Sequence, residues 1–325
     1  MMTGRSLFAA AIAVALFAIG AGSSAAAEQK LRVGKAVPNA FTFVPLDVGV
    51  DAGIFKHHGL DIEAYGFGGS AKLQQGMASN SIDIGIGSGP ELSFVAKGAP
   101  VLGVAAMAGK PALLCVVVAQ NGPVKTVADL KGKIVSSSTT GSLTTWLVRE
   151  LSRQQGWGPD GIKLAFLGEE GPQVAALRTG DVQGVTIQIA SGYRLEEEGV
   201  AKIIYRFGDI APHFIIHVIY ARKALIADDP DAIRRFLAGW FETIAYMESH
   251  KDDVVRIAAP IMGVKPELAA RAYDELMPTF SRDGKFDPEA LKVLARSYVE
   301  MELLPKEPDM QTLITEKFLP SATTH

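Results

Sequence analysis

The sequence predicts an α/β fold of two lobes, in which each lobe is a mostly parallel sheet flanked by helices and a helical C-terminal region packs on the first lobe. Three observations lead to this prediction. Short apolar segments alternate with helical patterns from residue 31 to residue 207, which is typical of parallel βαβ units. The roughly 300 residues after position 27 exceed what one compact core usually holds. Beyond residue 229 the apolar period is that of helices alone.

Residues 1–27 are predicted to be a cleaved signal peptide that is not part of the fold. Leu7–Ala21 is an unbroken apolar run after a short, positively charged start, and Ala25–Ala27 offers a cleavage site of the A-x-A kind. The run is shorter than the roughly 20 residues that a membrane-spanning helix needs, so an uncleaved anchor is the less favoured alternative. Charges or glycines interrupt every later apolar run. We therefore expect a periplasmic protein without stable membrane insertion.

Composition limits the partners of the protein. The chain carries 32 Lys and Arg residues against 35 Asp and Glu residues, a formal net charge of −3 at pH 7, and it has no basic cluster. This balance argues against nucleic acid and anionic membranes as partners. Cys115 is the only cysteine, which excludes an intramolecular disulfide. It lies in the apolar run Leu113–Val118, where we expect a buried and unreactive thiol.

The first lobe is predicted to begin at residue 28 and to run to residue 119. Its first two strands are Leu31–Lys35 and Leu60–Tyr65, whose residues alternate between apolar and polar. The helix between these strands has Leu46, Val50 and Ile54 on its buried face, and it ends before the second strand. Later strands are expected at residues 101–107 and around Cys115.

The stretch Gly66–Val101 is the one around which this lobe is organised. It predicts a loop, a helix, a strand, a glycine turn and a second helix. Ser70 is the expected N-cap of the first helix, the alternation over Ile82–Ile86 indicates the strand, and Pro90 suits the first position of the second helix. Each helix start leaves unpaired backbone N–H groups at the positive end of a dipole, which can hold a small polar or anionic group.

Residues 120–213 are predicted to form the second lobe, because Gln120–Lys125 is a polar break that contains Gly and Pro. Strands and helices alternate again in this lobe: strands Lys133–Ser136, Lys163–Leu167, Val182–Ile187 and Lys202–Phe207, and helices Ser142–Gln155, Pro172–Thr179 and Ser191–Glu198. We interpret the β-branched strand Phe214–Tyr220 as the return to the first lobe. Residues 214–325 then complete that lobe with helices, the first of which starts at Asp229-Pro230.

Two motifs that often carry chemistry have ordinary explanations here. Gly66–Ala71 matches the G-x-G-x-x-A form of the dinucleotide fingerprint, but no acidic residue ends the next strand about 20 positions later. His213 and His217 lie about 13 Å apart on an extended strand, too far to bind one metal ion, so a structural role is favoured. No nucleophile–base pair or metal motif occurs in the sequence. The sequence therefore predicts no catalytic site, cofactor or metal.

Polar helix starts are the remaining candidates for function. They are Gly69-Ser70 and Ser88-Gly89 in the first lobe, and Thr140–Ser142 and Ala190-Ser191 in the second. Helix capping explains each of them alone. As a group they follow the C-terminal ends of strands, and such loops border a common crevice in open parallel sheets. Two lobes of this kind that face each other would surround a small molecule.

Several short motifs, in their order along the chain, resemble those of a known protein family. They are Pro45 and Asp51–Phe55 with His58–Leu60, Leu73–Gly76 with Ile82–Gly85, Lys97–Val101, and Asp129–Lys133 followed by Gly141-Ser142. In these motifs the chain resembles the periplasmic substrate-binding proteins of ABC importers for nitrate, alkanesulfonates, taurine and thiamine-precursor pyrimidines. The resemblance covers nearly all of Gln29–Leu304. It implies a type II periplasmic binding protein fold, with two crossing strands as a hinge and closure of the lobes around a ligand.

The resemblance also implies, by position, where the ligand binds. The implied residues are Asn39, Phe41 and Thr42 after the first strand, Gly69, Ser70, Ser88 and Gly89 elsewhere in the first lobe, and Thr140, Gly141, Ser142 and Gln188 in the second. No Arg or Lys of these loops has to face the cleft, although Lys35 could. Phe41 and Phe43 suit a ligand with an apolar or aromatic body and one polar or anionic end.

The sequence is therefore interpreted as a monomeric, non-catalytic receptor that delivers a small organic solute to an ABC permease. Two alternatives stay open. One is an enzyme on the same scaffold that acts on a pyrimidine or on a metabolite derived from chorismate. The other is a periplasmic ligand sensor that signals to a membrane partner.

Overall fold

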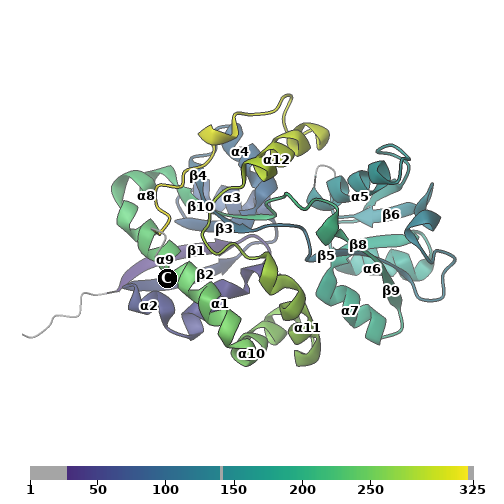
Figure 1. Cartoon of the computed structure of the whole chain (residues 1–325), viewed down its shortest axis with the longest axis horizontal. Coiled ribbons are helices and arrows are strands. Elements are labelled where there is room, and N and C mark those ends of the chain that lie inside the picture. The colour runs from purple at the N-terminus through teal and green to yellow at the C-terminus, as the bar shows by residue number, and fades with distance from the viewer. Residues whose placement is uncertain (1–27, 140–141, 321–325) are drawn as a thin grey trace, which may run out of the picture.

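The computed structural model describes residues 28–139 and 142–320, which form two lobes with a sheet in each (Figure 1). The signal-peptide prediction for residues 1–27 lies outside the described residues. The first sheet has the strand order β2-β1-β3-β10-β4 and the second the order β7-β6-β8-β5-β9. The strands are β1 (Gln29–Lys35), β2 (Leu60–Gly66), β3 (Ile84–Ser88), β4 (Val101–Ala108), β5 (Leu114–Ala119), β6 (Ile134–Ser137), β7 (Lys163–Phe166), β8 (Gly184–Gln188), β9 (Ala201–Arg206) and β10 (His217–Arg222).

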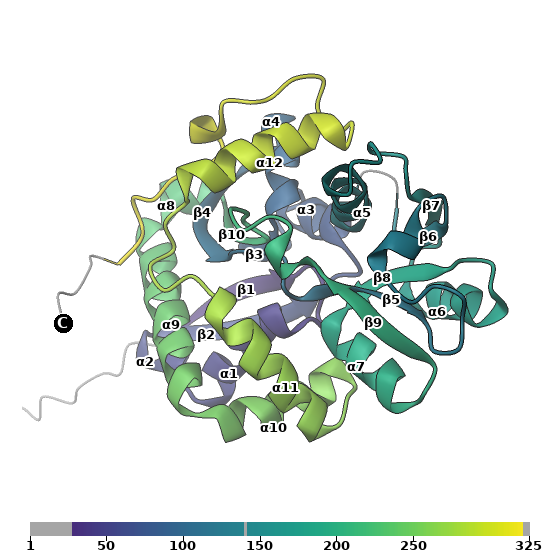
Figure 2. The ribbon, with the colours of Figure 1, turned by 45° about the vertical axis from the view of Figure 1, so that its right-hand side comes forward.

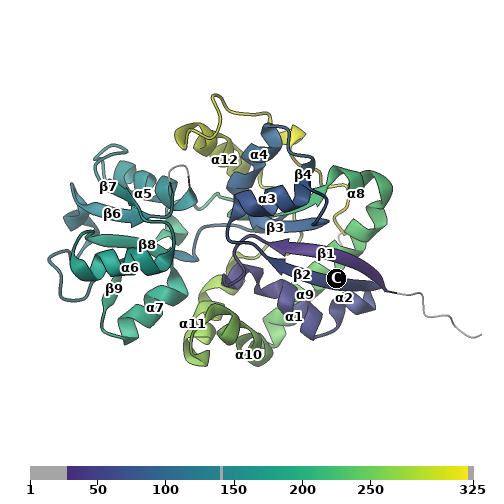
Figure 3. The same ribbon diagram turned by 180° about the vertical axis from the view of Figure 1, so that it is seen from behind.

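Helices flank both sheets. They are α1 (Val44–Asp51), α2 (Ile54–His57), α3 (Ser70–Ala78), α4 (Leu92–Ala96), α5 (Leu143–Gln154), α6 (Glu170–Thr179), α7 (Ile189–Glu197), α8 (Lys223–Asp228), α9 (Pro230–Ser249), α10 (Lys251–Met262), α11 (Pro266–Leu276) and α12 (Pro288–Glu300). Short 3₁₀ turns η1 (Phe41–Phe43) and η2 (Gly89–Glu91) precede α1 and α4. Seen from behind, α3 and α4 lie over the first sheet and α6 over the second (Figure 3).

Each sheet is parallel except for one strand. In the first sheet β1 pairs in parallel with β2 and β3, whereas β10 runs antiparallel to both of its neighbours, β3 and β4. In the second sheet β5 is the antiparallel strand, between β8 and β9. The two exceptional strands are the ones that follow the crossings between lobes. The predicted α/β fold class, with two mostly parallel sheets, is therefore confirmed.

The lobe boundary was expected at residue 120, and for strand β5 this expectation is wrong. Leu114–Ala119 was expected in the first lobe, but its residues pair with β8 and β9 of the second sheet. The apolar run is buried on both faces, so its composition fits a central strand of either sheet and cannot show which one it joins. The first crossing therefore falls at residues 109–113, and the return crossing lies between η4 (Phe207–Asp209) and β10.

The first helix also differs from its prediction. A single helix was expected to carry Leu46, Val50 and Ile54 on one buried face, but the chain breaks between α1 and α2 at Gly53, whose φ is +72°. Only glycine adopts this left-handed conformation at low cost. Val50 lies on α1 before the break and is 42% exposed, whereas Leu46 on α1 and Ile54 on α2 are buried.

The helical C-terminal region covers the first lobe, as expected, and also reaches the second. In the first lobe α9 packs on α1 and α2, with Phe236 stacked on Phe55. Figure 2 shows α11 beside α7, and α12 beside α5. Among residues 28–139 and 142–320, no helix combines the length and the apolar composition that a membrane crossing requires.

Two glutamates of this region bridge the lobes in the same way. Glu300 of α12 accepts hydrogen bonds from Trp146 Nε1 at 2.7 Å and from Arg153 at 3.3 Å, both on α5. Glu275 of α11 accepts a hydrogen bond from the Tyr193 hydroxyl on α7 and lies 3.4 Å from the Arg206 guanidinium. Burial and the Glu275 carboxylate raise the pKa of Tyr193 to about 12, so the phenol remains a donor. Each bridge thus joins one carboxylate to an aromatic donor and an arginine of the second lobe.

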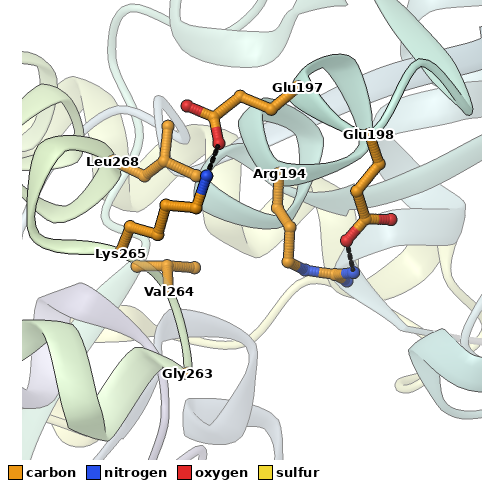
Figure 4. Close-up of a pocket in the computed structure, with 7 residues that line it drawn as sticks. All are labelled: Arg194, Glu197, Glu198, Gly263, Val264, Lys265 and Leu268. Atoms are coloured by element: carbon orange, nitrogen blue, oxygen red, sulfur yellow. Dashed lines mark hydrogen bonds and ion pairs between the residues drawn. The ribbon is translucent and has the colours of Figure 1, made fainter.

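The contact between the lobes at each of these two bridges is called a seam below. A small pocket lies along the seam that Glu275 bridges, between α7 and the start of α11 (Figure 4). It has a volume of about 210 Å³, and its charged side chains pair with one another. Lys265 Nζ lies 3.1 Å from Glu197 across the seam, and Arg194 pairs with Glu198 on the same helix at 3.1 Å. Because these charges already satisfy each other, the pocket is part of the inter-lobe contact and not a candidate ligand site.

Replacing Glu300 with Gln should open the ligand-free protein. The variant keeps the length of the side chain but loses the carboxylate that Trp146 and Arg153 share, which should cost about 1 kcal/mol of inter-lobe contact because the group is partly exposed. Solution scattering without ligand should show a larger mean radius of gyration. Glu289→Gln is the control, since Glu289 pairs only with Lys292 of its own helix among the described residues. An unchanged radius in Glu300→Gln, or an equal increase in the control, would contradict this role.

Candidate functional site

A cavity of about 670 Å³ lies between the two lobes, at the C-terminal ends of their parallel strands. The segments after β1, β2 and β3 line it from the first lobe, and those after β6, β7 and β8 line it from the second. This is the place where open α/β sheets bind ligands. Its volume is within the range of small-molecule sites.

In the first lobe, the start of α3 faces the cavity, although not as predicted. Gly69, with φ +127°, is the N-cap, so Ser70 is the first helical residue and caps nothing. The Gly69 N–H is donated to the carbonyl of Ala36 at 2.9 Å. The first-turn N–H groups of the helix have no acceptor within the helix, and Ser70 Oγ lies 3.3 Å from Ser88 Oγ. Gly69, Ser70 and Ser88 therefore meet at one wall of the cavity.

Below Ser88 lies a buried carboxyl group. The Ser88 N–H donates to Glu91 Oε1 at 2.7 Å, and Gln74 Nε2 donates to Glu91 Oε2 at 2.7 Å. Burial raises the pKa of Glu91, which is 1% exposed. Both oxygens of this side chain are thus occupied by the protein itself.

Gly89 contacts the crossing segment, so its N–H group is not available to a ligand. Its N–H is donated to the carbonyl of Ile216 at 2.8 Å, and a Cβ atom at this position would lie 2.0 Å from the carbonyl oxygen of Ile215. The expectation that Gly89 supplies a donor to the ligand is therefore wrong. The glycine is needed because the return crossing passes directly over its backbone.

In the second lobe, hydroxyl groups gather at the start of α5. Ser142 is the N-cap of the helix and accepts a hydrogen bond from the Thr145 N–H at 3.4 Å. Ser138 and Ser142 lie 3.0 and 2.9 Å from the hydroxyl of Thr144, and Thr139 also lines the cavity. Gln188 lines the cavity at the end of β8, as expected. The predicted residues Thr140 and Gly141 lie outside the described residues.

The loop after β1 contributes differently from its prediction. Asn39 is exposed and Thr42 is 1% exposed in the core, and neither lines the cavity. Phe41 packs against Tyr273 and Phe280, with ring centroids 6.3 Å apart in each pair. Phe43 lines the cavity instead. The reason is that these residues form a 3₁₀ turn, in which successive side chains point in different directions.

Lys35 does not bring its charge to the ligand. Its Nζ lies 2.8 and 2.7 Å from the two carboxylate oxygens of Asp47, and the side chain is buried. Among the described residues that line the cavity there is no Lys or Arg, whereas Glu91 and Glu169 are present. The apolar part of the lining consists largely of Phe43, Phe94, Leu113, Leu143, Ile216 and Leu303.

His217 is the cavity residue that the sequence prediction assigned to a structural role. It is the first residue of β10, is 6% exposed and lines the cavity, with its ring centroid 4.7 Å from that of Phe43. Its Nδ1 is shielded from solvent and has no hydrogen-bond partner in the part of the chain that the structure describes. Burial lowers the pKa of His217 to about 3, so the imidazole is neutral at physiological pH. His213 is exposed and pairs with Asp287 at 3.0 Å, away from the cavity.

Only the sheet order reveals His217 as a site residue. It lies opposite Ser88 because β10 inserts between β3 and β4, which local sequence patterns do not show. Metal binding has no candidate in the described ranges, because they contain no group of three or more His, Cys, Asp or Glu side chains that could hold an ion.

His217→Phe should make the protein less sensitive to acid. A histidine that is neutral when folded takes up a proton on unfolding between pH 6.5 and its folded pKa of about 3, so it destabilises the fold increasingly as the pH falls through that window. Between pH 7 and pH 4.5 this residue should account for about 2.5 kcal/mol of lost stability. Urea unfolding at both pH values should show that much less loss in the variant.

Phe43→Leu is the control for this measurement, because it alters the same wall without removing a titratable group. It should keep the pH dependence of the parent. An equal loss in His217→Phe and in the parent would show that the histidine is not held neutral.

The comparisons with known proteins agree with this geometry. A family model described as NMT1/THI5 like matches residues 40–253. A curated protein of Escherichia coli (strain K12) that is named for binding aliphatic sulfonates is 26% identical over 258 residues, which cover 76% of this chain and 77% of that protein.

Solved structures share the fold. The periplasmic aliphatic sulphonate binding protein SsuA from Escherichia coli has a TM-score of 0.75 at 22% identity, with 88% of this chain and 92% of that chain covered. The alkanesulfonate-binding protein SsuA from Xanthomonas axonopodis pv. citri, bound to MOPS, has a TM-score of 0.74 at 18% identity, with 90% and 99% covered. The desulfurization enzyme DszB has a TM-score of 0.62 at 16% identity, with 89% and 97% covered.

The solved structures thus show that the two lobes have the fold of periplasmic binding proteins, which was predicted from the sequence. The family model covers more than half of the chain and spans both lobes. The chain therefore belongs to the NMT1/THI5-like family.

Proposed function

We propose that this protein is a periplasmic receptor that captures a small organic solute between its lobes and delivers it to an ABC permease. The observation that carries the proposal is the cavity itself, which both lobes line with hydrogen-bonding groups and apolar side chains. The sulfonate-binding relative and the sulfonate-binding structures support a transport role. Export through residues 1–27 and action as a monomer belong to the same proposal.

The solute has a polar head with oxygen acceptors and an apolar body. Hydroxyls and helix starts of α3 and α5 approach the cavity from opposite lobes, and both are donors suited to an oxyanion or a neutral oxygen. The described lining has no cationic side chain and holds two glutamates, which disfavours a dianion. A singly charged head, such as a sulfonate, fits better, because a helix dipole supplies about half a charge at each start. The apolar wall around Phe43 and Leu143 would take the body.

Closure of the lobes is the motion that delivery requires. Two crossings, at residues 109–113 and before β10, are the only covalent connections between the sheets in the described chain. Hinge motion at such segments closes two-lobed proteins around ligands. The solute contacts both lobes, so its binding would favour the closed form that a permease recognises.

A receptor role is favoured over catalysis by the state of the reactive groups. The fold does not distinguish the two, since DszB is an enzyme with the same architecture. Cys115 is buried, and burial raises the pKa of its thiol, which keeps it a poor nucleophile. Glu91 is occupied by Ser88 and Gln74, so its carboxyl group is not poised to exchange protons with a ligand.

A ligand panel tests the receptor role. Alkanesulfonates of increasing chain length, with carboxylates and neutral amides of matched length, should be compared by thermal shift. A member present at 100 times its dissociation constant should stabilise the protein by about 2.7 kcal/mol and reduce the radius of gyration. The bound compound should be recovered unchanged after denaturation. Turnover of that compound would favour an enzyme, and binding without compaction would contradict the closure mechanism.

Ser142→Asp tests the charge of the head group. Asp and Ser cap helices almost equally well, so stability without ligand should change by less than about 0.5 kcal/mol. The new carboxylate would stand at the cavity and repel an anionic head, weakening a sulfonate on the order of 10- to 100-fold by calorimetry. Ser142→Asn is the matched control, because it caps the helix without charge and should bind within a few fold of the parent. Equal affinity of the Asp and Asn variants for the sulfonate would contradict an anion at this helix start.

A further inference from the structure

We propose that His217 determines the specificity of the cavity by presenting an uncharged imidazole N–H to an oxygen of the solute. The inference rests on the proposed receptor function, and it assigns a ligand contact to a residue for which sequence reasoning favoured a structural role. It makes a sulfonyl, carboxyl or carbonyl oxygen the group that the cavity requires next to its aromatic wall.

The position of His217 comes from the strand that carries it. The residue begins β10 and lies opposite Ser88 of β3 on one side and Ala108 of β4 on the other. The cavity thus has the histidine at the point where the return crossing enters the first sheet. The imidazole packs against Phe43, so its polar atoms stand beside the apolar part of the lining.

The hydrogen bonds of His217 are incomplete without a ligand. Nδ1 is shielded from solvent and has no partner in the part of the chain that the structure describes, and the residue is 6% exposed. Buried polar groups in folded proteins are almost always paired, and an unpaired one calls for an explanation. A simple apolar residue would fill the same space beside Phe43 at less cost. A histidine kept in the cavity wall at this cost therefore indicates that its other nitrogen, Nε2, meets a partner that arrives with the solute.

The shielding of Nδ1 selects the tautomer. An unpaired acceptor is tolerated in a protein interior more readily than an unpaired N–H, so the proton belongs on the nitrogen that can reach a partner. Because Nδ1 is shielded and His217 lines the cavity, we infer that Nε2 faces the cavity and carries the proton. The group that meets the solute is thus a donor, and it matches an oxygen acceptor.

The surroundings keep the imidazole uncharged. The titratable groups that share the cavity are Glu91 on η2 and Glu169 at the start of α6. Glu91 is bound to Ser88 and Gln74, and no ion pair joins either glutamate to His217 in the described structure. The nearest phenol from the same strand, Tyr220, donates to the carbonyl of Ser88. The contact to the solute is therefore a neutral hydrogen bond, and its strength should not depend on pH near neutrality.

The first experiment needs no ligand. Nitrogen-15 NMR of the imidazole groups in the purified protein should show His217 as the neutral Nε2–H tautomer from pH 5 to pH 8, assigned with His217→Gln. A charged ring in this range, or the Nδ1–H tautomer, would overturn the proposal. This result stands even if the receptor role fails, so the two failures can be told apart.

The second experiment uses 1-pentanesulfonate as the probe, which stays anionic at all the pH values tested. His217→Phe should bind the probe on the order of 10-fold more weakly, while the ligand-free melting temperature stays the same or rises. His217→Gln should keep affinity within a few fold, because the amide Nε2 lies near the place of the imidazole Nε2. His213→Phe, which changes an exposed histidine, is the control and should bind like the parent.

Two results would overturn the role of His217 as a neutral donor. One is unchanged affinity for the probe in His217→Phe. The other is an affinity of the parent that rises more than 10-fold between pH 8 and pH 5.5, which would mean that the ring binds the sulfonate as a cation. If the parent binds neither the probe nor any panel member, the receptor function fails, and the NMR result alone decides the state of the histidine.

Discussion

The insertion of β10 between β3 and β4 is the constraint on which the rest of the structure depends. This strand returns from the second lobe and runs antiparallel to both neighbours, and β5 does the same in the second sheet. Because each lobe is entered through a strand of opposite direction, the C-terminal ends of the parallel strands in both sheets meet at one gap. The same insertion brings the crossing segment over Gly89 and sets His217 opposite Ser88. The cavity is thus a product of the connections between the lobes.

The chemistry of the cavity follows from how the ionisable groups around it are paired or buried. Lys35 forms an ion pair with Asp47, and Glu91 accepts hydrogen bonds from Ser88 and Gln74. Burial keeps the His217 ring neutral. What remains toward the gap are hydroxyls, helix starts, the neutral His217 ring, Glu169 and apolar side chains. Such a surface can recognise an oxygen-rich head by hydrogen bonds and dipoles, and it releases the ligand more easily than a charged clamp would. Reversible release is what the proposed delivery of a solute requires.

The C-terminal helices connect the cavity to the conformation of the whole molecule. Glu275 and Glu300 each hold an aromatic donor and an arginine of the second lobe, at two separate seams. If the lobes close on the solute as proposed, the energy of these contacts would add to that of the ligand, and the affinity for every solute would scale with them. The cavity lining would then set which solute binds, and the seams would set how tightly any solute binds.

The sequence by itself determined the elements and the fold class. Alternating strands such as Leu60–Tyr65, the helix starts near Ser70 and Ser142, and the glycine turns are local patterns, and local patterns can be read without knowing what packs where. Tertiary structure decided which sheet β5 joins, that Phe43 and not Phe41 lines the cavity, that Gly89 serves the crossing, and that His217 belongs to the site. All four depend on contacts between segments that lie far apart in the sequence or on the exact direction of a side chain in a turn. The spacing of neighbouring residues encodes neither these long-range contacts nor these side-chain directions, because both follow from how the strands and crossings pack together.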